Sequence, residues 1–153
     1  MPILGDFTVL KMSGDPSVLT VIEPAIVGRD ASSNADSLKI PFGAGGCRVN
    51  DTGILSMMVR RLNRSAVAAV RIESEFSSIA SDDSLVGILT GTQDELQDQW
   101  FQQQFRIPTN TLSPANSNSA NVLHLGIARL QGGTGAIVEY EVRDIVVHFH
   151  QNS

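Results

Sequence analysis

The chain has 153 residues, of which 42% are hydrophobic and 18% are charged, and its net charge is −5. These values are typical of one globular domain over residues 1–153 rather than of a disordered tail. The acidic balance argues against nucleic acid as a partner. The apolar runs are too short to span a bilayer, and the first residues lack the basic and apolar parts of a secretory signal. We therefore expect no membrane contact, and the cellular location stays open.

Turn-forming residues recur about every 10 to 15 positions, which is typical of a β-sandwich or barrel. The first expected strands are residues 7–10 and 18–22, the second of which is rich in β-branched side chains. The segment 54–73 allows two interpretations. Its apolar residues are spaced acceptably for a helix, whereas its β-branched residues favour strands at 54–61 and 66–73 joined by a hairpin turn. We favour the strands.

The next segments combine one possible helix with further strands. Residues 92–95 have the spacing of a capping box, which predicts a short helical turn at 93–99. Alternating Phe and Gln residues then predict a strand at 100–108. Residues 121–130 also alternate, with Leu123, Leu125 and Ile127 on one face.

Residues 136–150 give the strongest strand pattern in the chain. Their alternation changes phase at Arg143 and Asp144, which predicts a β-bulge. The fold class is therefore all-β, and we expect an antiparallel β-sandwich of the jelly-roll kind.

The C-terminal third carries a loose motif: Trp100, then Phe105-Arg106-Ile107-Pro108, then Asn121-Val122-Leu123-His124-Leu125, and finally the strand that begins at Asp144. This order resembles the last three strands of galactose-binding-like jelly-roll domains, which include many carbohydrate-binding modules. The resemblance covers residues 100–149. It implies a jelly-roll fold, with sugar binding at loops or on a concave sheet face.

The aromatic residues bear on that implied sugar binding. Sugar sites generally use exposed aromatic platforms. The resemblance makes Trp100 a core residue, and we expect Tyr140 and the six Phe residues to be core residues as well. On these expectations the chain lacks such a platform.

The basic residues are nine Arg and only two Lys, and four of the Arg fall in one stretch. Arg60, Arg61, Arg64 and Arg71 could bind a phosphate or carboxylate through bidentate forks. The alternative is a solvated turn that balances the acidic remainder. Together with Trp100, the first three are the candidate ligand-binding residues.

Candidate metal ligands are few. His148 and His150 lie on one face of the last expected strand, where a single metal ion could reach both. Asp82 and Asp83 could hold a structural calcium, although acidic loop tips are common. The lone Cys47 cannot form a zinc cluster and is expected to be a small buried residue. We expect no other cofactor.

No motif in the chain carries a catalytic reaction, and we interpret Glu139 and Glu141 as solvated strand residues. The chain is therefore expected not to be an enzyme. Forty residues are Ser, Thr, Asn or Gln, a composition that suits polar β-surfaces in assembly, virion or appendage proteins. We predict first a self-associating structural or binding module, a homo-oligomer. The alternatives are a carbohydrate-binding domain or lectin and, third, a metal-binding protein that uses His148 and His150.

Overall fold

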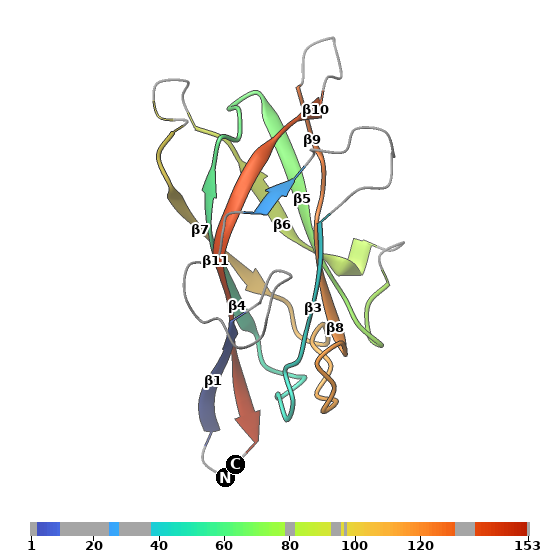
Figure 1. The fold of residues 1–153 in the computed structure, drawn as a ribbon. Coiled ribbons are helices and arrows are strands. Elements are labelled where there is room, and N and C mark those ends of the chain that lie inside the picture. Colours follow the sequence, from blue (N-terminus) through green and yellow to red (C-terminus); the bar gives the residue numbers. More distant parts are fainter. Residues whose placement is uncertain are drawn as a thin grey trace.

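Strands make up nearly all regular structure in the computed structural model, which describes residues 3–9, 25–27, 38–78, 82–92, 96, 98–130 and 137–152 (Figure 1). The elements are β1 (Ile3–Val9), β2 (Ala25–Val27), β3 (Leu38–Phe42), β4 (Gly53–Arg60), β5 (Ala66–Glu73), the 3-10 turn η1 (Asp82–Ser84), β6 (Leu85–Thr90), β7 (Phe101–Ile107), β8 (Asn121–Leu125), β9 (Ala128–Leu130), β10 (Ile137–Val138) and β11 (Tyr140–Asn152). The predicted all-β class is confirmed. The expected strand at 18–22 lies outside the described residues.

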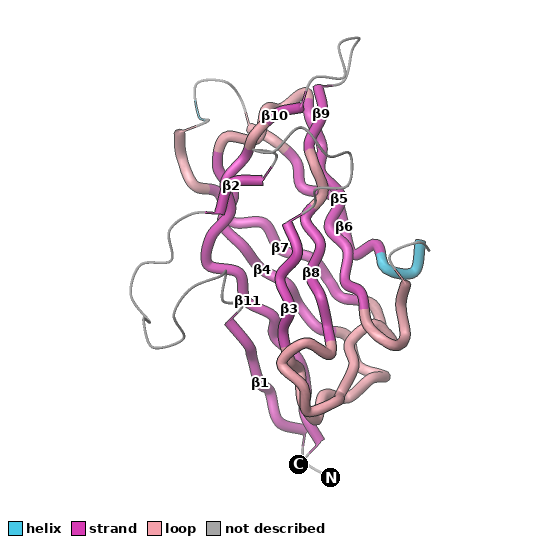
Figure 2. Tube along the Cα trace, turned by 45° about the vertical axis from the view of Figure 1, so that its right-hand side comes forward, coloured by secondary structure: helices cyan, strands magenta, loops and turns pink. Residues whose placement is uncertain are grey.

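The strands form two antiparallel sheets (Figure 2). The first sheet has the order β1-β11-β4-β7, and β2 also pairs with β11. In the second sheet β5 pairs with β6 on one side and with β8 and β9 on the other, while β3 pairs with β8 and β10 with β9. Eight strands remain when the short β2, β9 and β10 are left out. Renumbered 1 to 8 along the chain, they have the order 1-8-3-6 in the first sheet and 2-7-4-5 in the second. This is the double Greek-key order of a jelly roll.

The core lies between the two sheets. Its largest fully buried side chains include Leu55 of β4, Ile72 of β5, Leu123 of β8 and Tyr140 of β11. Each fully buried aliphatic side chain of this size contributes about 1.5–3 kcal/mol. The Tyr140 hydroxyl donates to the carbonyl of Gly126 at 2.6 Å, and burial raises the pKa of Tyr140. This hydrogen bond crosses the core from one sheet to the other.

The contested segment 54–73 is made of two strands, β4 and β5, but the predicted hairpin is wrong. β4 pairs with β11 and β7 in the first sheet, whereas β5 belongs to the second sheet. The connection is a crossover between sheets, in which Leu62 is buried and Arg61 adopts a left-handed φ of 65°. The Asn63 side chain accepts from the backbone N–H of Ser65, which closes the turn.

The predicted bulge in the last strand is present. The pairing of β11 with β4 shifts register between Arg143 and Val146, and Asp144 has a φ of 52°. The extra residue allows Val142 before the bulge and Ile145 after it to be buried on the same face.

The strand predicted at 121–130 is interrupted. β8 ends at Leu125 and β9 begins at Ala128, which is fully buried, while Ile127 is only partly buried. Gly126 donates its N–H to Ala69 of β5 at 2.9 Å in place of regular pairing. The alternation therefore changes phase, and Ala128 takes the core position that the pattern assigned to Ile127.

A side-chain amide joins the two sheets where β6 and β7 lie next to each other. Gln103 of β7 accepts from the Thr90 N–H at 3.1 Å and donates to the Thr90 carbonyl at 2.9 Å. It thereby pairs with β6 as a backbone peptide group would. The seam formed by Gln103 and Thr90 is packed further by Phe105, whose ring covers Gly87 so closely that a Cβ there would clash.

Helical structure is limited to single turns in the described residues. The Gln99 N–H donates to the Leu96 carbonyl at 3.0 Å, which is a turn inside the helix expected at 93–99. Residues 93–95 and 97 lie outside the described residues. The described part of the chain contains no helix long and apolar enough to cross a membrane.

Candidate functional site

The first sheet turns one face to the core and the other outward. On β4 Leu55 and Val59 are buried in the core, so Met58 and Arg60 point to the outer face. The same alternation places side chains of β11 and β7 on this face. Its cross-strand neighbours are Arg60 with Glu141, Met58 with Arg143, and Met58 with Gln102.

Trp100 lies on this outer face, and the expectation that it is a core residue is wrong. Ile107 at the end of β7 is fully buried, and strict alternation along the strand therefore turns Trp100 outward. The side chain is partly exposed. The guanidinium carbons of Arg60 and Arg143 lie 4.5 Å and 4.2 Å from the centroid of its ring. Such contacts each contribute about 0.5–2 kcal/mol, depending on their exposure.

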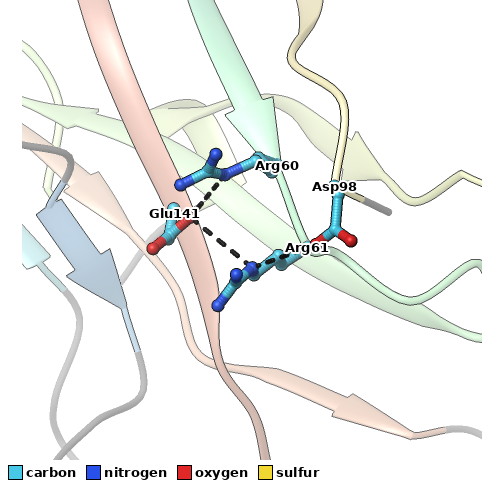
Figure 3. Close-up of polar contacts among 4 residues, drawn as sticks. All are labelled: Arg60, Arg61, Asp98 and Glu141. Carbon is cyan, nitrogen blue, oxygen red and sulfur yellow. Dashed lines mark hydrogen bonds and ion pairs between the residues drawn. The ribbon is translucent and has the colours of Figure 1, made fainter. Parts of the chain in front are cut away.

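Arg60 and its neighbour Arg61 both contact one carboxylate, that of Glu141 (Figure 3). Glu141 accepts from Arg60 Nε at 2.6 Å and lies 3.9 Å from Arg61 Nε. Its side chain is only 13% exposed, so the interpretation of Glu141 as a solvated residue is wrong. Arg61 also contacts Asp98 at 3.6 Å, and both of these side chains are largely exposed. We call Trp100, Arg60, Arg61, Glu141 and Arg143 the tryptophan cluster.

Arg143 is placed by the bulge in β11. Its Nε lies 3.4 Å from the Asp144 carboxylate, but the contact lacks hydrogen-bond geometry. Nε is shielded from solvent and donates no hydrogen bond, while the side chain as a whole is 38% exposed. A shielded donor without an acceptor is costly, which makes Arg143 the least satisfied member of the tryptophan cluster.

The other end of the same face carries a shallow hollow of about 330 Å³. Phe7 is 60% exposed and Ile54 is 48% exposed in this hollow, and the Phe7 ring lies 6.1 Å from the ring of His148. Phe76 is 47% exposed elsewhere. The expectation that all Phe residues are core residues is therefore wrong. Phe7 on β1 is the cross-strand neighbour of His148 on β11, and both side chains lie on the outer face of the sheet.

The two histidines of the predicted metal site are exposed on the outer face of β11, as the alternation predicts. His150 Nδ1 lies 3.2 Å from the Asp51 carboxylate, which also contacts Arg48. In the described residues, no three His, Cys, Asp or Glu side chains lie close enough together to hold a metal ion. Asp83 is exposed within η1, and the side chain of Asp82 lies outside the described residues.

The remaining arginines of the predicted cluster do not join the tryptophan cluster. Arg64 lies exposed on the turn between β4 and β5. Arg71 belongs to the second sheet and donates to the Ser84 hydroxyl at 3.0 Å. The four arginines are close in sequence, but β4 and β5 carry them to different sheets.

The second sheet carries a row of basic side chains on its own outer face. Lys39, His124 and Arg71 are direct cross-strand neighbours. His124 is buried to 7% exposure, and its Nε2 lies 3.8 Å from Glu73 without a hydrogen bond. Burial, assisted by Lys39 and Arg71 and opposed by Glu73, lowers the pKa of His124.

Sequence reasoning did not assign Glu141 or Arg143 to the site. The alternation of 136–150 does place both on one face, so this signal was available. The pairing of Glu141 with Arg60 could not be predicted from the sequence. These residues lie 81 positions apart and meet only through the register of β11 with β4.

Comparison with known proteins yields little. No family model matches the chain, and no curated protein matches it. Among solved structures, the arabinose-bound MgGH51 α-L-arabinofuranosidase superposes on 95% of this chain with a TM-score of 0.46 and 11% sequence identity. The match spans only 22% of that enzyme's chain. A similarity this low carries no argument about the site or the function.

Proposed function

We propose that this protein is a non-catalytic carbohydrate-binding module whose binding site is the tryptophan cluster. The observation that carries the proposal is the position of Trp100, which lies partly exposed on a sheet face among side chains rich in N–H donors. An aromatic ring contacts the C–H groups of a sugar, and neighbouring donors bind its hydroxyl oxygens. The exposed amides of Gln102 and Gln104 continue this polar surface along β7.

The arrangement of Glu141 supports binding rather than catalysis. A catalytic carboxylate must be free to transfer a proton or to attack the substrate. Glu141 instead accepts from Arg60 and lies within ion-pair distance of Arg61. We therefore assign it the structural role of orienting the two guanidinium groups.

Affinity electrophoresis and a glycan array test the proposal. The wild-type protein should bind at least one saccharide. Trp100→Ala should weaken this binding roughly tenfold, because loss of an aromatic that stacks on a nucleic-acid base costs about 1–3 kcal/mol and a sugar ring packs on an aromatic face in a similar way. Phe76→Ala, which removes an exposed aromatic outside the cluster, is the matched control and should bind normally. Absence of binding to every saccharide on the array would refute the proposal.

Self-association is a second candidate, and the apolar hollow at Phe7 and Ile54 favours it. Exposed apolar side chains that gather on one surface are typical of contact sites between proteins. Light scattering should give a clean multiple of 16.4 kDa for the wild-type chain. Phe7→Ser should lower that mass, whereas Phe76→Ser should leave it unchanged. A monomer at high concentration would exclude this candidate.

A further inference from the structure

We propose that the tryptophan cluster recognises a carboxylate group, so that the ligand is an acidic saccharide that contains uronic acid. This inference rests on the proposed function and names its ligand class. It is drawn from the unused donors of Arg60 and Arg143 and from the way both arginines contact Trp100.

A guanidinium group over an aromatic ring keeps its N–H groups available for acceptors at its edge. Arg60 donates from Nε to Glu141 (Figure 3), and its terminal nitrogens form no hydrogen bond to the described residues. Arg143 forms no hydrogen bond to the described residues, and although its Nε is shielded, the side chain is 38% exposed and can offer its terminal nitrogens. Two guanidinium groups at one ring therefore present free donors in the fork geometry that matches the two oxygens of a carboxylate.

The charges of the cluster also favour an anionic ligand. Arg60 and Arg143 contact the same ring and repel each other, and the nearest shielded carboxylate, Glu141, is already bound to Arg60. The other carboxylates are Asp144 beside Arg143 and Asp98 beside Arg61, and their side chains are 61% and 90% exposed. Exposed ion pairs of this kind are weak. A ligand carboxylate that forms hydrogen bonds to both guanidinium groups can displace them.

Trp100 restricts the ligand to a saccharide rather than to any anion. Trp100 is partly exposed and can contact the C–H groups of a sugar, and Gln102 on β7 can supply further hydrogen bonds. A polymer that carries carboxylates without sugar rings would satisfy the arginines alone.

The test compares polymers that differ only in charge. Polygalacturonate, alginate and hyaluronan are each measured beside their fully methyl-esterified forms by isothermal titration calorimetry, with polyglutamate as a carboxylate polymer without sugar rings. At least one acidic saccharide should bind, and its ester should bind at least about tenfold more weakly, because the ester loses a charge-assisted bidentate pair.

Substitutions locate the effect. Arg143→Gln should weaken binding of the acidic saccharide roughly tenfold, and Arg143→Lys should restore little, because an ammonium group lacks the fork. Arg106→Gln makes the same change of charge on the same face of the sheet. Arg106 lies six residues after Trp100, which is about 20 Å along the strand, so this substitution should have no effect. Circular dichroism spectra of all variants check that they fold.

Each other outcome overturns one statement. Equal binding of a saccharide and its ester, unaffected by Arg143→Gln, would overturn the carboxylate inference and leave the proposed function in place. Equal binding of polyglutamate would show unspecific attraction to anions and would also overturn the inference. Binding to neutral saccharides alone would also overturn the carboxylate inference. Binding to no saccharide at all would refute the proposed function itself.

Discussion

His124 is a basic group buried between two cations. Lys39 and Arg71 flank it across the second sheet, and Glu73, at 3.8 Å from Nε2, is the nearby acceptor among the described residues. Its pKa in the folded protein therefore lies below the ordinary value of 6.5, and burial is the main cause. In the unfolded chain the same imidazole is hydrated and titrates near that value.

This difference predicts acid sensitivity. As the pH falls below 6.5, the unfolded chain binds a proton that the folded chain does not, so the free energy of unfolding decreases until the pH reaches the lowered pKa. Thermal unfolding between about pH 7.5 and about pH 5.5 should show this loss. His124→Gln should reduce the loss, whereas His148→Gln, an exposed histidine on the other sheet, should not. An identical pH profile for wild type and His124→Gln would contradict the prediction.

The bulge in β11 is the element that places Arg143 beside Trp100. It depends on Asp144, whose φ of 52° lies in the left-handed region. Aspartate, asparagine and glycine tolerate this region, and β-branched residues do not.

Asp144→Val should therefore lower the free energy of unfolding by about 1–2 kcal/mol, and Asp144→Gly should not. Urea unfolding measures both variants. Asp144→Val should also weaken saccharide binding through the displaced Arg143. Equal stability of the two variants would show that the left-handed conformation is not required.

The same element shows what the sequence can and cannot predict. The bulge and the faces of β11 follow from local alternation of apolar residues, and so do the strands β4, β5 and β7. The alternation along β7 also predicts that Trp100 points outward, but the family resemblance placed this residue in the core. Which sheet β5 joins, and which arginine meets Glu141, depend on pairing between distant segments that no local pattern encodes.

Side-chain hydrogen bonds connect the two sheets of the molecule in addition to the apolar core between them. The Tyr140 hydroxyl reaches across the core to Gly126, and Gln103 pairs with Thr90 at the seam between β6 and β7. The amide of Gln103 replaces both hydrogen bonds that a neighbouring strand would give to Thr90.

Gln103→Ala should therefore open this seam. The loss of two hydrogen bonds, each of about 0.5–1.5 kcal/mol, should lower stability and speed hydrogen exchange of the Thr90 amide. Gln104→Ala, which removes an exposed amide on the adjacent position, is the control. Unchanged exchange at Thr90 in Gln103→Ala would show that the side-chain pairing contributes nothing.

The pairing of β1 with β11 has a consequence for biosynthesis. Ile3 of β1 pairs with Asn152 of β11, so β1 finds its partner only after β11 has been made. β2 also pairs with β11, and β4 needs the same strand on one side. The second sheet can assemble earlier, because β3, β5, β6 and β8 pair with one another. During translation the first sheet therefore stays incomplete, with unpaired strand edges exposed, until residues 140–152 emerge.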